Sequence, residues 1–334
     1  MMIDCTLKDV ATSIQTGPFG SQLHSSDYSE EGTPVVMPQD IVDGQISESK
    51  IARVDDSQVE RLARHKLKQG EIVYPRRGDL AKCAFVTPNE ENWLCGTGCL
   101  KVTIDTSKAN PKYIYFYLQL PDSVSCIENA TIGSTMPNLN TGILGNVRLK
   151  LPNIDIQNKI VDILSQYDEL IAINRKKIQV LEEMAMRTYR EWFVHMRFPG
   201  YETTPKEDGL PQGWNYESLA ELGSFKRGVN ITKDVAIEGE IPVVAGGLSP
   251  SCYHNVANTL APVITVSASG ANAGFTRLYF QNIWAADCSY LDSNCPHIFY
   301  IYCFMKTYKE GIDNLQKGSA QPHVYANLDK ISEL

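Results

Sequence analysis

The sequence predicts an α+β protein in which two similar α+β domains are joined by one long coiled-coil helix. Three observations predict it: a long segment free of Gly and Pro with apolar heptads, short strand and helix patterns on both sides, and the return of the same order of patterns afterwards. We expect a first domain at residues 1–152, the long helix at 153–198, a linker at 199–210 and a second domain at 211–334.

The first domain is predicted to combine short strands and helices with long loops. Runs of β-branched and apolar residues predict the strands, and a Pro at the first helical position predicts an aromatic helix. In chain order we expect a short helix or strand at 7–10, a Gly- and Ser-rich loop at 17–21, strands at 33–37, 71–74 and 101–104, the aromatic helix at 111–118, a loop at 133–140 and a strand at 147–151.

Gly78 closely follows the strand at 71–74 and predicts a turn between two strands. Arg76, Arg77 and Lys82 would then surround the tip of a hairpin. Arginine is well suited to bidentate contact with guanine, although contact with phosphate is more common. A solvated hairpin tip without a ligand is the alternative interpretation.

The helix itself is predicted at residues 155–196, with Asp155 as N-cap and Phe198-Pro199-Gly200 after its end. Its seam alternates steps of three and four residues through Leu164, Tyr167, Ile171, Asn174, Ile178, Leu181, Ala185, Thr188 and Trp192. At a rise of roughly 1.5 Å per residue the helix would be about 60 Å long and would need an equally long partner. Asn174 favours a paired helix, because a buried amide in the seam fixes register.

After the helix the same signals return in the same order. Residues 219–222 correspond to 7–10, and residues 241–244 correspond to 33–36. The strand at 263–266 leads to Gly270 as the strand at 72–74 leads to Gly78. Residues 296–302 then correspond to 111–117, and residues 318–322 correspond to 133–137. The sequence therefore predicts a tandem duplication. Because Leu334 corresponds to Leu149, the sequence ends where a second long helix would begin, and we expect either a shortened sequence or another chain that supplies that helix.

Composition narrows the classes of function. The 334 residues are 43% hydrophobic, which suffices for two or three domains. No apolar run is long enough for a bilayer, so we expect a cytoplasmic protein without a membrane partner. Nine cysteines contain no C-x-x-C pair, and Cys95 with Cys99 lacks a matching second pair, so no metal site is expected. The net charge is −8 and no part is basic, so DNA contact would require local clusters or a partner.

Several motifs resemble the specificity subunit of type I restriction-modification systems over essentially the whole chain. They are Gly17-Pro18-Phe19-Gly20-Ser21, the repeated Gly-Ser-x-x-Pro element, Leu151-Pro152-x-x-Asp155-x-Gln157-Asn158-Lys159-Ile160, Leu164-Ser165-x-Tyr167-Asp168-Glu169-Leu170-Ile171-x-x-Asn174-Arg175-Lys176-Lys177-Ile178 and Glu191-Trp192-Phe193. The resemblance implies two target-recognition domains, each reading half of a split DNA site, held at a set distance by two long helices. The second of these helices would lie beyond Leu334, so we expect it to be missing from this sequence.

The resemblance also implies partners. They are double-stranded DNA, two modification subunits, which would bind S-adenosylmethionine, and restriction subunits in the full complex. No cofactor is expected in this chain. Pairing of two chains through their single helices, as a homodimer or by fragment complementation, stays open. The partner-binding residues of the helix would be Leu164, Tyr167, Ile171, Asn174, Ile178, Leu181 and Trp192.

Candidate DNA contacts lie in the loops of both domains. In the first domain they are Gly20, Ser21, Arg76, Arg77, Lys82, Asn138 and Asn140, and the two asparagines would pair with adenine edges or form Asx turns. In the second they are Lys226, Arg227, Asn230, Ser269, Asn272, Lys317, Ser319, His323 and Tyr325. The small polar residues allow close approach of a DNA backbone but also suit ordinary turns, and a lone histidine is more often structural.

Catalysis by this chain is not predicted. Asn110-Pro111-Lys112-Tyr113 partly resembles the Asn-Pro-Pro-Tyr motif of amino methyltransferases, but Lys112 replaces the second Pro, and we interpret Pro111 and Pro296 as helix starts. The sequence contains no P-loop, no dinucleotide-binding fingerprint and no closely spaced nuclease-like carboxylate and lysine set. The two alternatives are an S-adenosylmethionine-dependent DNA methyltransferase and a coiled-coil scaffold without DNA contact, which the acidic charge favours.

Overall fold

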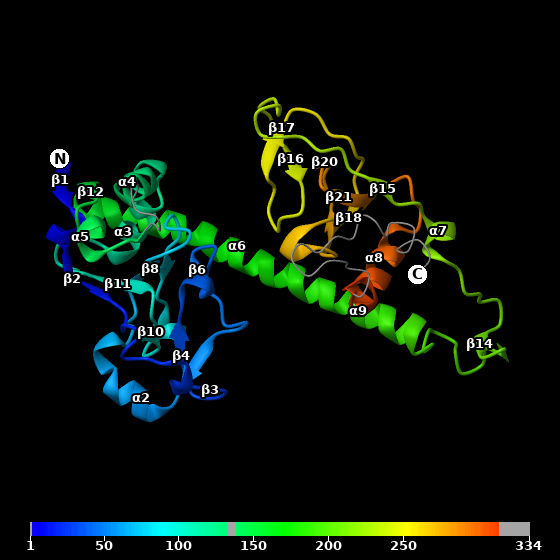
Figure 1. The fold of residues 1–334 in the computed structure, drawn as a ribbon, viewed down its shortest axis with the longest axis horizontal. Coiled ribbons are helices and arrows are strands. Elements are labelled where there is room, and N and C mark those ends of the chain that lie inside the picture. The colour runs from blue at the N-terminus through cyan, green and yellow to red at the C-terminus, as the bar shows by residue number, and fades with distance from the viewer. Residues whose placement is uncertain (1, 132–137, 314–334) are drawn as a thin grey trace. The chain divides into compact units, whose positions relative to one another are not determined.

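The protein is described by a computed structural model, which covers residues 2–131 and 138–313. Contacts between Cα atoms divide the chain into two compact units, Met1–Ala172 and Ile173–Leu334, called unit 1 and unit 2 below. Figure 1 labels many of the elements of each unit and colours the chain from its amino to its carboxyl end. Each unit mixes short strands with short helices, and one long helix runs through the boundary between them. The predicted α+β class is confirmed.

Unit 1 contains two four-stranded sheets. The antiparallel first sheet has the order β2 (Ala11–Thr16), β11 (Cys99–Ile104), β8 (Ile72–Pro75) and β9 (Ala84–Phe85). The second has the order β10 (Leu94–Cys95), β4 (Thr33–Val36), β7 (Ala52–Val54) and β3 (Tyr28–Ser29), with β10 parallel to β4. Two further strand pairs join β1 (Ile3–Thr6) to β12 (Arg148–Leu151) and β5 (Ile41–Val42) to β6 (Gln45–Ile46).

The helices of unit 1 cover one face of its first sheet. They include α1 (Leu7–Val10), α3 (Pro111–Leu118), α4 (Pro121–Thr131) and α5 (Thr141–Gly145), while α2 (Asp56–Arg61) packs on the second sheet. Because side chains alternate along a strand, Tyr74 and Leu100 enter the core under the helices, whereas Val73 and Cys99 enter a core shared with the second sheet.

The aromatic helix α3 begins where the sequence predicts it. Asn110 is its N-cap, and the side-chain oxygen accepts hydrogen bonds from the backbone N–H groups of Lys112 (2.9 Å) and Tyr113 (3.2 Å). Pro111 occupies the first helical position, where no intrahelical donor is needed. The interpretation of Asn110-Pro111-Lys112-Tyr113 as a helix start is confirmed.

Unit 2 repeats this architecture in the part of it that the structure describes, which ends at residue 313. Its main sheet has the order β15 (Lys226–Arg227), β21 (Cys288–Leu291), β18 (Val263–Ser267) and β19 (Thr276–Tyr279), and its second sheet has the order β17 (Cys252–His254), β16 (Ile241–Val244) and β20 (Trp284–Ala285). The remaining strands are β13 (Lys206–Glu207) and β14 (Leu210–Pro211), and the helices are α7 (Leu219–Leu222), α8 (Ile298–Thr307) and α9 (Lys309–Asp313).

Matching hydrogen bonds show that the two units share one register. The Gly17 N–H donates to the Cys99 carbonyl (2.9 Å), and the Gly228 N–H donates to the Cys288 carbonyl (2.8 Å). In both units the second sheet contains a parallel pair, β10 with β4 and β20 with β16. The predicted duplication is confirmed for the described elements. The paired segments at 133–137 and 318–322 lie outside the described residues.

The long helix is α6 (Ile154–Tyr189), followed by a single π-helical turn, η5 (Arg190–Val194). Its start differs from the prediction: Asn153, rather than Asp155, accepts the N–H of Ile156 through its side-chain oxygen at 3.0 Å. Gln157, buried in unit 1, accepts the Asn110 N–H at 2.9 Å and fixes the amino end.

The carboxyl end of α6 also differs, because it stops at Tyr189 and the predicted end was Met196. Aromatic packing inside unit 2 decides this boundary. The buried Tyr189 ring lies 5.3 Å from that of Tyr300, and the Phe193 ring lies 5.5 Å from that of Trp214. Met196 then adopts a positive φ of 57°. Tertiary contacts thus replace the last predicted helical turns by η5 and an irregular exit.

Candidate nucleic-acid interface

Three loops of unit 1 leave the same edge of its first sheet. Strand β2 ends at Thr16, β8 ends at Pro75 and β11 begins at Cys99; Thr16 pairs with Leu100, and Pro75 pairs with Cys99. Residues 17–21, 76–78 and 96–98 therefore start from neighbouring positions. We call this set of loops the recognition edge of unit 1.

Hydrogen bonds bring a fourth segment to this edge. Leu139 donates its N–H to the Arg76 carbonyl (2.8 Å), and the Arg76 Nε donates to the Leu139 carbonyl (3.3 Å). The Arg76 N–H also donates to the Gly98 carbonyl (2.7 Å). The Arg76 turn and the segment that carries Asn138 and Asn140, separate in the sequence, are thus adjacent in the fold.

The hairpin around Gly78 is confirmed, since β8 pairs with β9 and Gly78 has a φ of 82°. Its basic residues differ in availability. Arg77 is exposed, Arg76 is half-buried and bonded to Leu139, and the Lys82 Nζ lies 3.2 Å from the Asp79 carboxylate. Arg77 is therefore the member best placed to meet a ligand.

Asn140 has a structural task that the sequence left open. It is the N-cap of α5, and its side-chain oxygen accepts the Ile143 N–H at 2.9 Å. Asn138 is exposed, so its amide is accessible to solvent. Of the two asparagines, Asn138 is the freer candidate for contact with a base edge.

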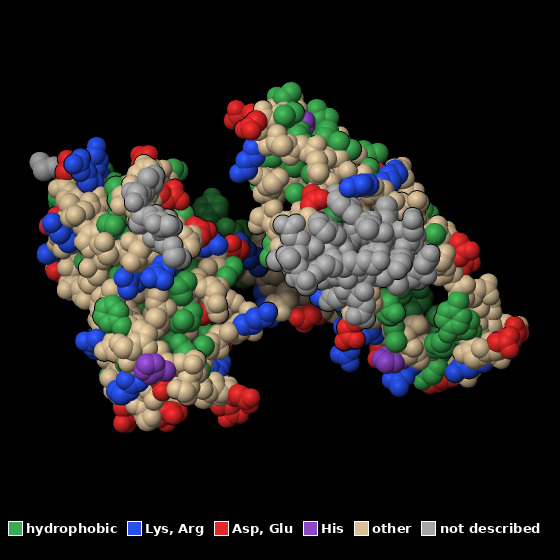
Figure 2. Space-filling view, in the orientation of Figure 1, with side chains coloured by type: hydrophobic (Ala, Val, Ile, Leu, Met, Phe, Trp, Pro, Cys, Tyr) green, Lys and Arg blue, Asp and Glu red, His purple; other side chains and the backbone are tan. Residues whose placement is uncertain are grey.

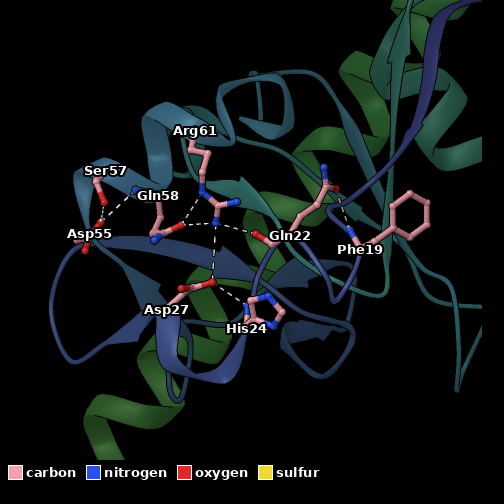
Figure 3. Close-up of polar contacts among 8 residues, drawn as sticks. All are labelled: Phe19, Gln22, His24, Asp27, Asp55, Ser57, Gln58 and Arg61. Atoms are coloured by element: carbon pink, nitrogen blue, oxygen red, sulfur yellow. Dashed lines mark hydrogen bonds and ion pairs between the residues drawn. The ribbon is translucent and has the colours of Figure 1, made fainter.

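The loop at 17–21 is held by the arginine of a neighbouring helix, as Figure 3 shows. The Arg61 Nη2 donates to the Gln22 carbonyl at 2.7 Å and lies 3.8 Å from the Asp27 carboxylate. The Gln22 side chain in turn accepts the Phe19 N–H at 3.2 Å. Gly20 and Ser21 are exposed at the loop tip, and a Cβ added at Gly20 would meet no atom within 4 Å.

Close packing fixes the base of this loop in both units. A Cβ on Gly17 would lie 2.0 Å from the Gly96 carbonyl oxygen, and one on Gly228 would lie 2.1 Å from that of Ala286. Only glycine fits such an approach, so the same residue recurs at the same place. The glycine positions the loop rather than contacting a ligand itself.

The recognition edge of unit 2 is defined by the equivalent strand ends and carries different side chains. Lys226 and Arg227 lie on β15 instead of in the predicted loop, and the Lys226 Nζ is 3.9 Å from the Asp292 carboxylate. Ser269 donates its hydroxyl to Asp287, and the Asn272 Nδ2 donates to the Gly246 carbonyl at 3.4 Å.

The remaining candidates of unit 2 divide into two groups. Asn230 is exposed in the loop after β15. Lys317, Ser319, His323 and Tyr325 lie outside the described residues.

The predicted seam of α6 is largely apolar and solvent-exposed. Its exposed members are Leu164, Tyr167, Ile171, Asn174, Ile178, Leu181, Ala185, Thr188 and, in the turn that follows α6, Trp192. Ile178 is 57% exposed and Leu181 is 53% exposed, although both are strongly apolar. An apolar stripe of this extent is typical of a surface that binds a partner.

Sequence reasoning missed a buried ion pair beside the recognition edge of unit 1. The Lys101 Nζ lies 3.2 Å from both carboxylate oxygens of Glu71 and donates to the Lys66 carbonyl at 2.6 Å. Thr103 donates its hydroxyl to Glu71 at 2.6 Å. A lysine at a buried position of the apolar run at 99–104 was the available signal, because such a residue needs a partner.

In the described part of the chain, no group of three His, Cys, Asp or Glu side chains could hold a metal ion. Burial raises the pKa of the Cys95 thiol to about 12 and raises that of the Cys99 thiol as well, so both are protonated at neutral pH.

Residues 2–131 and 138–313 also contain no helix long and apolar enough to cross a membrane.

Charge is dispersed over the face drawn in Figure 2, where Lys and Arg alternate with Asp and Glu in small groups. The fold and the loops together define a duplicated α+β protein with an exposed, largely apolar stripe on its long helix. Comparison with known families identifies it further. The model of the type I restriction modification DNA specificity domain matches residues 4–183, and the chain belongs to this family.

Two curated relatives agree. The chain is 25% identical over 225 residues to the putative type I restriction enzyme MjaX specificity subunit of Methanocaldococcus jannaschii, covering 66% of this chain and 51% of the relative. It is 24% identical over 226 residues to the type I restriction enzyme HindI specificity subunit of Haemophilus influenzae, covering 65% and 46%. The chain thus spans about half the length of these relatives.

A solved structure shows the same fold. The type I restriction-modification system S subunit from M. genitalium superposes with a TM-score of 0.52 at 17% identity, covering 94% of this chain and 79% of that chain. At this identity the likeness supports the architecture of two α+β units and a long helix, and the function requires a separate argument.

Proposed function

We propose that this chain is the sequence-specific DNA-recognition subunit of a type I restriction-modification complex and reads a bipartite site, one half with each unit. The supporting observation is that both units build a recognition edge on the same strand ends, with Gly17 and Gly228 at equivalent places and different polar side chains around them. Shared positions suit shared tasks, and divergent ones suit the reading of different bases.

Methyl transfer, translocation and cleavage are assigned in this proposal to partner subunits. Asn110 acts as a helix cap, because its side-chain oxygen already accepts hydrogen bonds from two backbone N–H groups. This geometry opposes the alternative of a methyltransferase built on that motif. The chain would determine which DNA sequence the complex recognises.

The test of DNA reading begins with the pattern of methylated positions in cells that carry this gene with its cognate modification gene. A split recognition site is expected. A single continuous site, or methylation without sequence preference, would contradict the proposal of two readers.

Arg77→Ala should then weaken binding of the cognate duplex by about 1–3 kcal/mol, because Arg77 is the exposed arginine of the Gly78 hairpin. Lys82→Ala is the matched control, since its charge is already paired with Asp79 at 3.2 Å. Affinity is measured with the modification subunit present. Equal affinities of wild type and Arg77→Ala would remove Arg77 from the interface.

We further propose that the seam of α6 docks the two modification subunits, and through them the restriction subunits. Ile178→Glu with Leu181→Glu should abolish assembly and leave folding unchanged, because both side chains are more than half exposed. Gln166→Glu with Gln179→Glu adds the same charge at exposed positions outside the seam. Light scattering of mixtures with the modification subunit checks the outcome, and intact assembly of the seam variant would refute the docking site.

The exposed seam also favours a second candidate, a coiled-coil scaffold that joins proteins without touching DNA. The net charge of −8 agrees with it. A mass of two chains in light scattering of the protein alone, combined with no duplex binding by the assembled complex, would favour the scaffold. Duplex binding with sequence preference would exclude it.

A further inference from the structure

A polar cavity of about 420 Å³ lies on the first sheet of unit 1, next to the recognition edge. Strand β2 contributes Thr12, Ser13 and Gln15, and the segment that contains η3 (Ala63–His65) contributes Arg64, Lys66 and Lys68. The Lys101–Glu71 ion pair also lines it. The cavity therefore offers hydroxyl, amide and cationic donors within one small volume.

The charge of the cavity is positive within an acidic chain. Among its described lining residues Glu71 is the one carboxylate, and Lys101 neutralises it at 3.2 Å. No ion pair within 4 Å involves Arg64, Lys66 or Lys68 among the residues that the structure describes. These three cations thus have no carboxylate partner and are available to an anion.

The cavity is also held in shape before any ligand arrives. Burial and the neighbouring charges of Arg64 and Lys101 lower the pKa of His65 to about 4, so His65 is neutral at pH 7. Its Nε2 accepts a hydrogen bond from the Arg64 Nε at 2.9 Å. The Lys101–Glu71 pair holds the same segment against the sheet, since Lys101 bonds to the Lys66 carbonyl and the Lys68 N–H donates to Glu71 at 2.9 Å.

The second unit shows that the fold does not require this ion pair. The shared register places Tyr290 at the position of Lys101 and Val263 at that of Glu71. A buried ion pair stabilises no better than apolar residues of similar size. Its presence in unit 1 alone, beneath three unpaired cations, indicates a role beyond folding.

We propose that this cavity holds one phosphate of the DNA backbone beside the bases that unit 1 reads. The proposal rests on the proposed function and extends it to residues that carry no sequence information. Its location supports it, because Gln15 lies one residue before Thr16, where β2 enters the recognition edge. A backbone phosphate bound there would orient the duplex over the loops.

The experiment compares Lys66→Gln with Lys68→Gln, made together, against wild type, with the modification subunit present. Fluorescence anisotropy of a labelled duplex is measured over a range of NaCl concentrations. The loss of one phosphate contact should reduce the slope of log affinity against log salt by about 1. The affinity should fall by a similar factor on the cognate duplex and on a scrambled one, because phosphate contacts do not discriminate sequence.

Arg148→Gln with Lys150→Gln is the matched control, since it removes two charges from exposed positions of β12, outside the cavity. It should keep the wild-type slope. Thermal melting confirms that both variants fold. Calorimetry with inorganic phosphate provides a second arm.

A wild-type slope in the Lys66 and Lys68 variant would overturn the proposal. Inorganic phosphate that binds wild type but not the variant, with equal DNA slopes, would overturn it in favour of a free-anion site. Wild type that binds no duplex at all would overturn the proposed function together with this extension, whereas duplex binding with an unaffected slope would overturn the extension alone.

Discussion

The two recognition edges share one backbone arrangement and differ in the side chains that it carries. Gly17 and Gly228 make the same hydrogen bond and the same close approach to a carbonyl, so the turn that starts each edge is a common requirement. Lys101 and Tyr290 occupy one position of the main sheet with opposite chemistry, an ammonium in one unit and an aromatic ring in the other. The duplicated units therefore keep the same strand pairing in the main sheet and the same glycine turn, while the polar side chains at these places differ.

Lys101→Ala tests the difference between the two units at its buried charge, and we expect it to reduce stability more than the other substitutions do. It leaves Glu71 buried and without a cation, which should destabilise unit 1 by about 3–5 kcal/mol. Denaturant unfolding at neutral pH measures the change. Lys101→Tyr with Glu71→Val installs the residues of unit 2 and should recover most of the loss.

A loss below about 1 kcal/mol for Lys101→Ala would show that Glu71 takes up a proton or water at little cost. Failure of the double replacement to recover stability would show that the two sheets tolerate different side chains in spite of their equal register. The second result would weaken the inference that the ion pair has a purpose other than folding, because unit 1 would then need the pair in order to fold.

The glycines provide the second test, and here the two units should respond alike. Gly17→Ala and Gly228→Ala each place a Cβ within about 2 Å of a carbonyl oxygen, at 2.0 Å and 2.1 Å. Each should lose about 1–3 kcal/mol in its own unit, because the backbone must move apart. Gly20→Ala is the control: its Cβ meets no atom within 4 Å, and we expect a change within about 0.5 kcal/mol. Thermal or denaturant unfolding followed with a probe in each unit measures the effects, and unequal losses would show that the turns are not equivalent.

The sequence predicted elements well where local signals decide them. The helix at Pro111–Leu118 has the expected bounds, because proline marks its start. The segments at 7–10 and 219–222 also have the expected bounds and are helices, a type that the sequence had left open between helix and strand. The predicted end of α6 was wrong, because this end is decided by the packing of Tyr189 and Phe193 on aromatic rings that lie far away in the sequence. Local patterns carry no information about such contacts.

The candidate site was predictable in part for the same reason. Glycines and arginines marked the loops at 17–21 and 76–78, but the bond between Arg76 and Leu139 joins residues far apart in the chain. The Lys101–Glu71 pair likewise depends on strand register, which periodicity alone does not give. The cavity that this pair lines is built from four separate segments and has no motif of its own.

The smallest expected effect concerns Asn140, whose cap and base-reading interpretations a single pair of variants separates. Asn140→Ala removes the oxygen that accepts the Ile143 N–H and should cost about 1 kcal/mol of stability. Asn140→Asp keeps an acceptor oxygen and should retain stability, but it lacks the amide donor needed to pair with adenine. Unfolding and duplex affinity are measured for both. If Asn140→Asp binds the cognate duplex as well as wild type does, Asn140 is a cap only, and adenine reading at this edge falls to the exposed Asn138.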